Sequence, residues 1–178
     1  MPSATSEFDD AYDDLGREPP ALSGEVLDHP IRLLEPREAV LISSSASVAE
    51  AVVILNERKA GCVLVMEGGK LVGIFTDRDI VRRVLPTGLA LDQVRVGDHT
   101  TKELDVLTLD DSIAFALNRM SAGDSRHVPL VDAAGHPLAV VSVRDVVNFV
   151  VRHFAGSVHN LPPAPPSRSS DRPPHGAA

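Results

Sequence analysis

The sequence predicts an α/β fold of the α+β type, built from two tandem copies of one small motif. Residues 42–51 and 107–116 have similar patterns at an offset of about 65 residues, and TDRD at 76–79 is matched by SVRD at 142–145. Between these matches, each copy contains two β-rich runs around a glycine-containing turn. Because the same order of elements occurs twice, we interpret the chain as an internal repeat.

The first copy has the order strand, helix, strand, strand, helix. Residues 40–43 form a short predicted strand, after which Ser47 and Glu50 have the spacing of a helix-capping box. The helix that follows has apolar residues along one face, namely Val48, Ala51, Val52 and Leu55. Residues 62–66 and 71–75 then form two strands joined by a tight turn in which glycine supplies a positive φ.

The second copy repeats this order. Its first helix has an apolar stripe of Ile113, Ala116, Leu117 and Met120. Residues 128–131 and 138–141 are its hairpin strands, with the turn at 133–136, and the last helices of the two copies start at Thr76 and Ser142. Each copy thus has a three-stranded sheet and two helices, which leaves one sheet face uncovered. Packing the copies as a pseudo-two-fold module would bury both faces.

Composition gives the boundaries of this module. Residues 1–24 are acidic and lack an apolar period, so we expect a flexible arm. The first motif is predicted at 25–92 and the second at 93–156. Residues 157–178 are rich in proline and predict a disordered tail.

Charge and hydropathy exclude several classes of function. A formal net charge of −8 argues against nucleic acid as a partner, because such binding depends first on a basic surface. No apolar run approaches the roughly 20 residues that a membrane span needs. The first residues lack the basic start and apolar stretch of a secretory signal, so we expect a cytoplasmic protein. Cys62 is the only cysteine, which excludes an intramolecular disulfide and favours a small buried hydrophobe.

Catalytic motifs are missing from the sequence. The seven histidines show no pair at the helical spacing of metal ligands, and there is no glycine-rich phosphate loop. No serine lies in a nucleophile elbow. We therefore predict no enzyme activity, no metal site and no catalytic cofactor.

Three segments resemble the CBS domain family: GIFTDRDI at 73–80, VGDHTT at 96–101 and SRHVPLVD at 125–132. The similarity extends over roughly 26–154 and is specific as a set, although each segment alone is weak. Pairs of such motifs are called Bateman modules. The resemblance implies a stand-alone regulatory pair that binds an adenosine-containing nucleotide between its two copies.

The resemblance also implies which residues bind the ligand. In the family, a threonine or serine at a strand end and an aspartate three residues later bind sugar and phosphate, which corresponds to Thr76 with Asp79 and Ser142 with Asp145. A carboxylate can accept hydrogen bonds from both ribose hydroxyls, while a hydroxyl and free helix amides favour phosphate. The first site would add Thr108, Arg126, His127 and Val128. The second would add Ser43, Gly61 and Cys62.

These residues also have simpler interpretations. Thr76 with Asp79 and Ser142 with Asp145 have the spacing of helix-capping boxes, and a hydroxyl can serve as cap and ligand together. Arg126 and His127 fit a solvated loop as well as a phosphate site. If they bind phosphate, the first site is the charged one, and the second, which has no such side chains, is weaker, empty or suited to adenosine without phosphate.

We predict a sensor of AMP, ADP or ATP that signals to an unidentified protein partner by a change of conformation. The alternatives are an interaction module without a ligand, or a sensor of NAD or S-adenosylmethionine. The last helix has a long apolar stripe of Val143, Val146, Val147, Val150, Val151 and Phe154, widened by Phe149. A stripe wider than one sheet needs predicts a homodimer. We expect Val150→Glu or Phe154→Glu to disrupt it.

Overall fold

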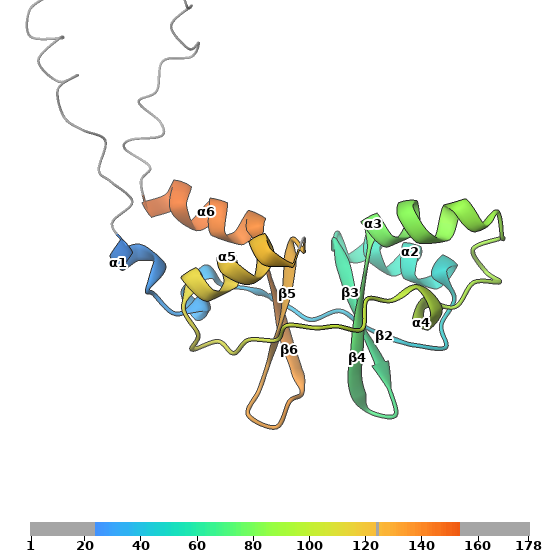
Figure 1. The fold of residues 1–178 in the computed structure, drawn as a ribbon, viewed down its shortest axis with the longest axis horizontal. Helices are drawn as coiled ribbons and strands as arrows, with labels where there is room; N and C mark the ends of the chain where they lie inside the picture. Colours follow the sequence, from blue (N-terminus) through green and yellow to red (C-terminus); the bar gives the residue numbers. More distant parts are fainter. Residues whose placement is uncertain (1–23, 124, 154–178) are drawn as a thin grey trace, which may run out of the picture.

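The computed structural model describes residues 24–123 and 125–153. The acidic arm before residue 24, the proline-rich tail and Phe154 lie outside the described residues. Two half-domains stand side by side, each with a β-hairpin below and helices above (Figure 1). The predicted fold class is confirmed, with one three-stranded sheet in each half.

The first half contains the sheet β2-β3-β4, made of β2 (Leu41–Ser43), β3 (Cys62–Glu67) and β4 (Lys70–Thr76). β2 is parallel to β3, and β3 is antiparallel to β4. Helix α2 (Val48–Arg58) begins at Ser47, whose side chain forms the predicted capping box with Glu50. The hairpin turn has Gly68 and Gly69 at φ of 55° and 79°, values that only glycine adopts readily.

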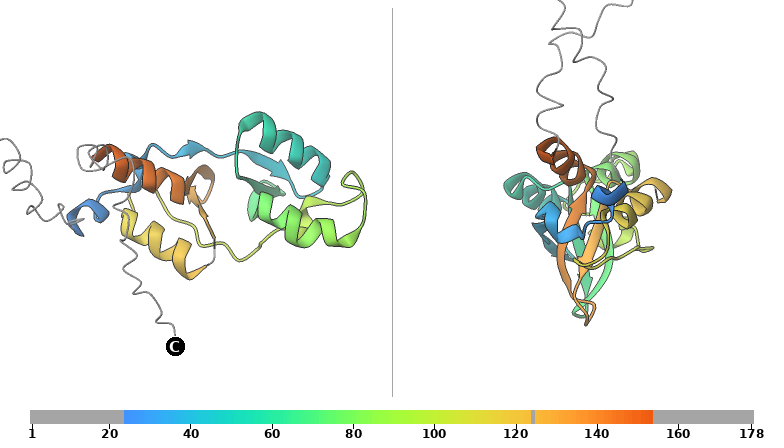
Figure 2. Two further views of the ribbon diagram at one scale, coloured as in Figure 1. Left: turned by 90° about the horizontal axis from the view of Figure 1, so that it is seen from above. Right: turned by 90° about the vertical axis from the view of Figure 1, so that its left-hand side faces the viewer.

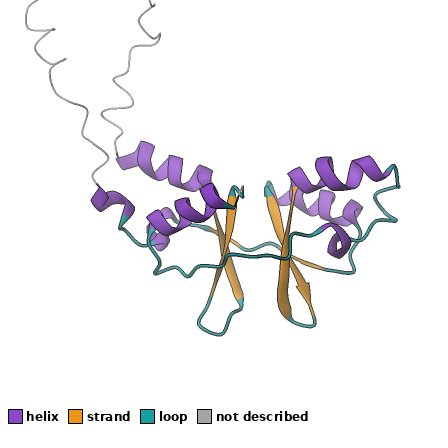
Figure 3. Cartoon of the chain, in the orientation of Figure 1, coloured by secondary structure: helices purple, strands orange, loops and turns teal. Residues whose placement is uncertain are grey.

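The second half contains the sheet β1-β6-β5. Its hairpin consists of β5 (His127–Val131) and β6 (Pro137–Ser142), and its helices are α5 (Ile113–Ala122) and α6 (Val143–His153), shown in Figure 3. Leu107 makes a parallel bridge to Leu130 at the position that β2 occupies in the first half. The core of this half includes Ile113, Leu130 and Phe149.

Each half is completed by the segment that precedes the other repeat in the sequence. Helix α1 (Gly24–Leu27), the 3-10 helix η2 (Ile31–Leu34) and β1 (Arg37–Glu38) all belong to the second half, where β1 pairs with β6. Conversely, Val94 and α4 (Val96–His99) pack in the core of the first half, and Thr101 bridges Ile74 of β4. The predicted boundaries at 25 and 93 describe the repeat in the sequence, and the packing crosses them.

The two sheets face each other across an apolar interface. Alternation along β3 sends Val63 and Val65 toward the helices of their own half, and Cys62 and Leu64 toward the other half. There they meet apolar residues that include Val140 of β6. The two extended segments that precede the repeats cross the middle of the molecule beside this interface (Figure 2).

The last helix differs between the halves. In the second half, α6 is a single α-helix, whereas the first half has α3 (Asp77–Asp79), the π-helix η3 (Ile80–Val84) and the 3-10 helix η4 (Leu85–Thr87). Pro86 lies in η4, and a proline lacks the backbone N–H that an α-helix interior requires. Within 24–123 and 125–153, no helix has the length and apolar content needed to cross a bilayer.

Candidate functional site

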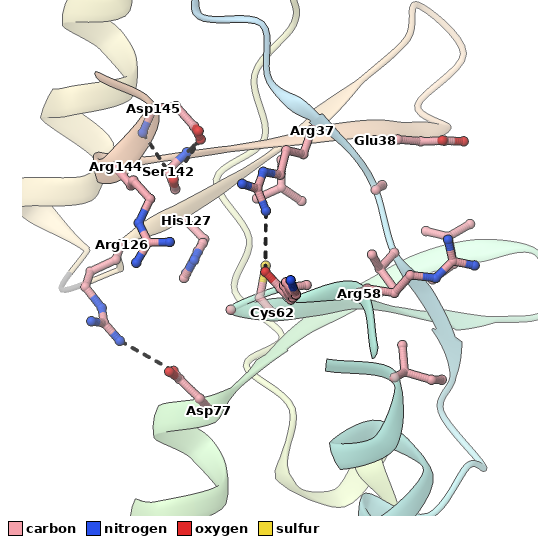
Figure 4. A pocket seen from close by; sticks show the side chains of 18 of the residues that line it. Arg37, Glu38, Arg58, Cys62, Asp77, Arg126, His127, Ser142, Arg144 and Asp145 are labelled. Carbon is pink, nitrogen blue, oxygen red and sulfur yellow. Dashed lines mark hydrogen bonds and ion pairs between the residues drawn. The ribbon is translucent and has the colours of Figure 1, made fainter. Parts of the chain in front are cut away.

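A cavity of about 850 Å³ lies between the two halves and is lined by residues of both. Figure 4 shows that Ser142 and Asp145 are at one end, Arg37 and Glu38 of β1 along one side, and Cys62 near the middle. The apolar lining consists of Ala39, Val40, Leu41, Ile54, Ala60, Cys62, Val140 and Val143. Leu41 and Val143 are both partly exposed, so apolar surface is available to an occupant of the cavity.

Ser142 and Asp145 form a capping arrangement at the start of α6. The backbone N–H and the hydroxyl of Ser142 donate hydrogen bonds of 2.8 and 2.7 Å to Asp145 Oδ2. The backbone N–H of Asp145 donates to Ser142 Oγ in return. Among the described residues, no hydrogen bond or ion pair involves Asp145 Oδ1. One oxygen of this half-buried carboxylate therefore remains able to accept hydrogen bonds, and Asp145 is part of the cavity lining.

Gly61 and His127 occupy corresponding positions in the two copies and come together in this cavity. A Cβ atom added to Gly61 would lie 2.8 Å from His127 Nε2 and 3.0 Å from Cε1. The absence of a side chain at Gly61 thus makes room for the imidazole. Burial lowers the pKa of His127, and Arg126 lowers it further, while Asp77 and Asp145 act in the opposite direction. These effects together lower the pKa of His127, which favours the neutral imidazole.

The thiol of Cys62, the only cysteine in the sequence, has low reactivity. Cys62 is buried at the start of β3, and burial together with nearby Asp77 raises the pKa of its thiol to about 12. A thiol with this pKa stays protonated near neutral pH and is a poor nucleophile. Its position agrees with the sequence-based interpretation of Cys62 as a small buried hydrophobe.

The structure groups the predicted site residues differently from the sequence-based expectation. Arg126 and His127 line the cavity of Ser142 and Asp145, rather than lying apart from it with Thr76 and Asp79. The physical reason is that corresponding positions of the two copies meet in the middle of the module, so both loops before β3 and β5 border one cavity. Arg126 Nη2 lies 3.4 Å from Asp77 Oδ1. The lining around Ser142 and Asp145 thus includes charged side chains of both signs, where the sequence indicated a neutral site.

Sequence reasoning missed three basic residues of the lining, Arg37, Arg58 and Lys59, and it assigned Arg144 no more than a possible phosphate contact. Arg37 lies on β1 and donates a 3.4 Å hydrogen bond to the carbonyl of Lys59, which joins the two sides of the cavity. Its place follows from the crossing of the N-terminal segment, for which the sequence carries no local signal. The position of Arg144 inside the SVRD motif was a usable signal.

The remaining predicted residues lie outside the lining of this cavity. Thr76 and Asp79 form a capping box like that of Ser142, but Asp79 is buried and its Oδ1 lies 3.4 Å from Arg83 Nε. Thr108 binds Asp111 through its N–H and hydroxyl, and Ser43 pairs with a neighbouring serine hydroxyl. Val128 is buried in the core of the second half.

A metal site is not formed by the described part of the chain. Within 24–123 and 125–153, no three histidine, cysteine, aspartate or glutamate side chains lie close enough together to hold an ion. The cavity instead combines an accepting carboxylate, apolar walls and several cationic side chains. This arrangement suits an organic ligand that carries hydroxyl and anionic groups.

Known proteins resemble the described part of the chain. The CBS domain family model matches residues 34–86 and 96–152, which is more than half of the chain. The mitochondrial CBS domain-containing protein CBSX3 of Arabidopsis thaliana is 28% identical over 120 residues, covering 65% of this chain and 58% of that protein. The chain therefore spans less than two thirds of that relative.

Solved structures with the same fold were also found. The CBS-domain containing protein ATU1752 of Agrobacterium tumefaciens is 30% identical with a TM-score of 0.63, covering 68% of this chain and 98% of that one. The CBS domain pair of protein MJ0100, solved with 5′-methylthioadenosine and S-adenosyl-L-methionine, is 20% identical with a TM-score of 0.61, covering 68% and 98%. At 20% identity, this second likeness concerns the fold alone.

Proposed function

Because the chain belongs to the CBS domain family and is a CBS domain pair, a regulatory module, we propose that it binds a phosphorylated adenosine, AMP, ADP or ATP, in the cavity between its halves. One observation carries the proposal. Asp145 Oδ1 has no hydrogen bond or ion pair within the described residues, and Asp145 lines a cavity that has apolar walls and both cationic and acidic side chains.

Each part of the ligand has a matching group in the cavity. The ribose hydroxyls would donate hydrogen bonds to the Asp145 carboxylate, and charged acceptors of this kind give the stronger hydrogen bonds. Leu41 and Val143 offer apolar surface for a purine ring. Arg126 and Arg144 supply guanidinium groups, which suit phosphate geometry. The structural relative bound to 5′-methylthioadenosine and S-adenosyl-L-methionine supports an adenosine ligand for this fold.

The lining has one more basic than acidic side chain, which favours an anionic ligand over the sulfonium cation of S-adenosylmethionine. Its basic side chains are Arg37, Arg58, Lys59, Arg126 and Arg144, and its acidic ones are Glu38, Glu57, Asp77 and Asp145. This excess of cations contrasts with a chain whose net charge is −8. NAD and S-adenosylmethionine share the adenosine end and remain the competing ligands, and a surface-only interaction module is the competing function.

Signalling would follow from the place of the cavity. Since its lining comes from both halves, a ligand contacts both, and it favours the relative orientation to which it binds best. We propose that a partner protein reads this orientation and that the module acts as a non-catalytic cytoplasmic homodimer. The dimer surface would include α6, on which Val147 is 52% exposed and Val143 is 37% exposed.

Calorimetric titration of AMP, ADP, ATP, adenosine, NAD and S-adenosylmethionine tests the proposal. We expect the adenine nucleotides to bind, and the double substitution Arg126→Ala with His127→Ala to weaken ATP more than adenosine. A matched control is Arg95→Ala, because Arg95 is exposed and lies outside the cavity lining. Equal losses for ATP and adenosine would contradict the phosphate role, and no binding of any compound would refute the proposed function.

A further inference from the structure

The two aspartates of the repeated motif are equivalent in sequence and in their caps. Thr76 donates hydrogen bonds to Asp79 Oδ2 from its N–H at 2.9 Å and its hydroxyl at 2.7 Å. Ser142 does the same to Asp145 Oδ2 at 2.8 and 2.7 Å. In both halves the cap therefore uses only one carboxylate oxygen, and the difference between the halves lies in the other oxygen.

In the first half, Arg83 takes this second oxygen. Its Nε lies 3.4 Å from Asp79 Oδ1. Its Nη1 donates to the carbonyl of His99 at 3.2 Å and to the hydroxyl of Thr101 at 3.1 Å. Thr101 is itself held by the bridge to Ile74 of β4. The guanidinium is thus fixed from two different segments over a carboxylate that is already buried.

In the second half, the corresponding groups leave the carboxylate open. Phe149 stands at the position of Arg83, four residues after the aspartate, and its ring is buried in the core. Arg37 stands at the position of Thr101, because each pairs with the same point of its sheet edge. Arg37 binds the carbonyl of Lys59 across the cavity and makes no ion pair with Asp145 among the described residues.

We propose that the chain binds one nucleotide, at Asp145, and that Arg83 closes the equivalent position at Asp79. This inference rests on the proposed function. A ribose at Asp79 would have to displace Arg83 from Oδ1, which would leave a cation without its carboxylate and break two further hydrogen bonds. The repeat thus carries one motif in two roles, a ligand site in the second half and a structural ion pair in the first.

Titration calorimetry of the full chain with ATP tests this arrangement. We expect a stoichiometry of one per chain. Asp145→Asn should weaken binding about tenfold to a hundredfold, the range for losing hydrogen bonds to a charged acceptor. Asp79→Asn, its matched control, should leave affinity unchanged while lowering the melting temperature. Two sites per chain, or loss of binding from Asp79→Asn with Asp145→Asn unaffected, would overturn the inference.

The role of Arg83 has its own test. Arg83→Ala should open the first position and add a second, weaker binding event to the same titration. Arg95→Ala is the control, because Arg95 is exposed and on a different element. A stoichiometry that stays at one in Arg83→Ala would overturn the blocking role. Wild-type protein that binds no nucleotide would instead refute the proposed function, so the two failures are distinguishable.

Discussion

The two halves of the molecule share an order of elements but differ in how each aspartate of the repeated motif is used. In the first half, the buried carboxylate is held by a cap and by Arg83. In the second half, the same cap leaves one oxygen of Asp145 without a partner among the described residues, and Asp145 lines the cavity. A repeated motif therefore predicts a repeated local structure, while the residue four positions further along decides whether the site is available. The following experiments challenge this comparison.

The largest expected difference between the halves is the effect of a side-chain methyl group at Gly73 of β4 and at the corresponding Ala139 of β6. A Cβ at Gly73 would lie 1.9 Å from Thr100 Cγ2 and 2.8 Å from the carbonyl oxygen of Thr101. The corresponding residue of the second half is Ala139, which the structure accommodates. We expect Gly73→Ala to reduce the free energy of unfolding by about 1–3 kcal/mol, as overpacking does. Chemical denaturation measures this.

The reverse substitution is the matched control. Ala139→Gly should cost about 0.5–1 kcal/mol, the scale of glycine in a strand interior. Equal losses from Gly73→Ala and Ala139→Gly would contradict the asymmetry of the two edges.

The oligomeric state tests the proposed dimer contact through α6, the last helix of the second half. Only in this half is the last helix a regular α-helix. Val147→Glu places a like charge across a symmetric α6 contact and should raise the dimer dissociation constant at least about tenfold, which corresponds to roughly 1.4 kcal/mol. Light scattering after size exclusion measures the mass. Val150 is a poorer choice than the sequence indicated, because it packs against the core of the second half. Phe154 lies outside the described residues.

Val53→Glu is the control for this experiment, since Val53 is 53% exposed on α2 of the other half. A wild-type mass near the 18.9 kDa of one chain at micromolar concentration would refute the dimer. Equal dissociation by Val53→Glu and Val147→Glu would place the contact elsewhere.

Removal of either helix cap should lower the stability of the protein by a similar amount, but only one removal should affect ligand binding. Thr76→Ala and Ser142→Ala each remove a side-chain cap, which typically costs about 1 kcal/mol. Only Ser142→Ala should also weaken ATP, because Ser142 orients the carboxylate that borders the cavity. Denaturation and calorimetry on both variants give the comparison. ATP affinity reduced equally by both substitutions would mean that both motifs bind the ligand.

The smallest effect concerns pH. Burial lowers the pKa of His127 below its ordinary value of 6.5, so the unfolded chain binds this proton more readily than the folded chain. Stability should therefore fall as pH drops below about 6.5 toward the folded-state pKa. Melting temperatures of the wild type and of His127→Gln at pH 7.5 and 5.5 isolate the contribution of His127 to the pH dependence of stability. A wild type that loses no more than His127→Gln would contradict it.

Much of the fold was predictable because the signals are local. Ser47 and Glu50 predicted the cap of α2, and the glycine pair predicted the hairpin turn, since each depends on residues close in sequence. The crossing of β1 and Thr101 to the opposite sheets was not predictable. It depends on contacts between residues that are far apart in the chain, and a single sequence contains no pattern for them.

In the candidate site, too, the features set by nearby residues were predictable and those set by distant contacts were not. Ser142, Asp145, Gly61 and Cys62 line one cavity, as their places in the repeated motif and its partner strand indicate, whereas Ser43 of the same predicted group lies outside the lining. Arg126 and His127 were assigned to the other pair, because sequence does not show that the two copies meet around one cavity. The blocking contact of Arg83 was missed as well. Its spacing from Asp79 suggests an ordinary exposed helix pair until the burial of the carboxylate is known.

The crossing segments have a consequence for folding. Val26 and Ile31 complete a core whose other members include Phe149, more than a hundred residues away in the chain. Neither repeat has its full set of core residues when it is cut from the chain between the motifs. We therefore expect the two halves to unfold in one cooperative transition and to fold slowly for their size, because high contact order slows folding. During synthesis, the hydrophobic residues of the N-terminal segment stay exposed to solvent until α6 has been made and can pack against them.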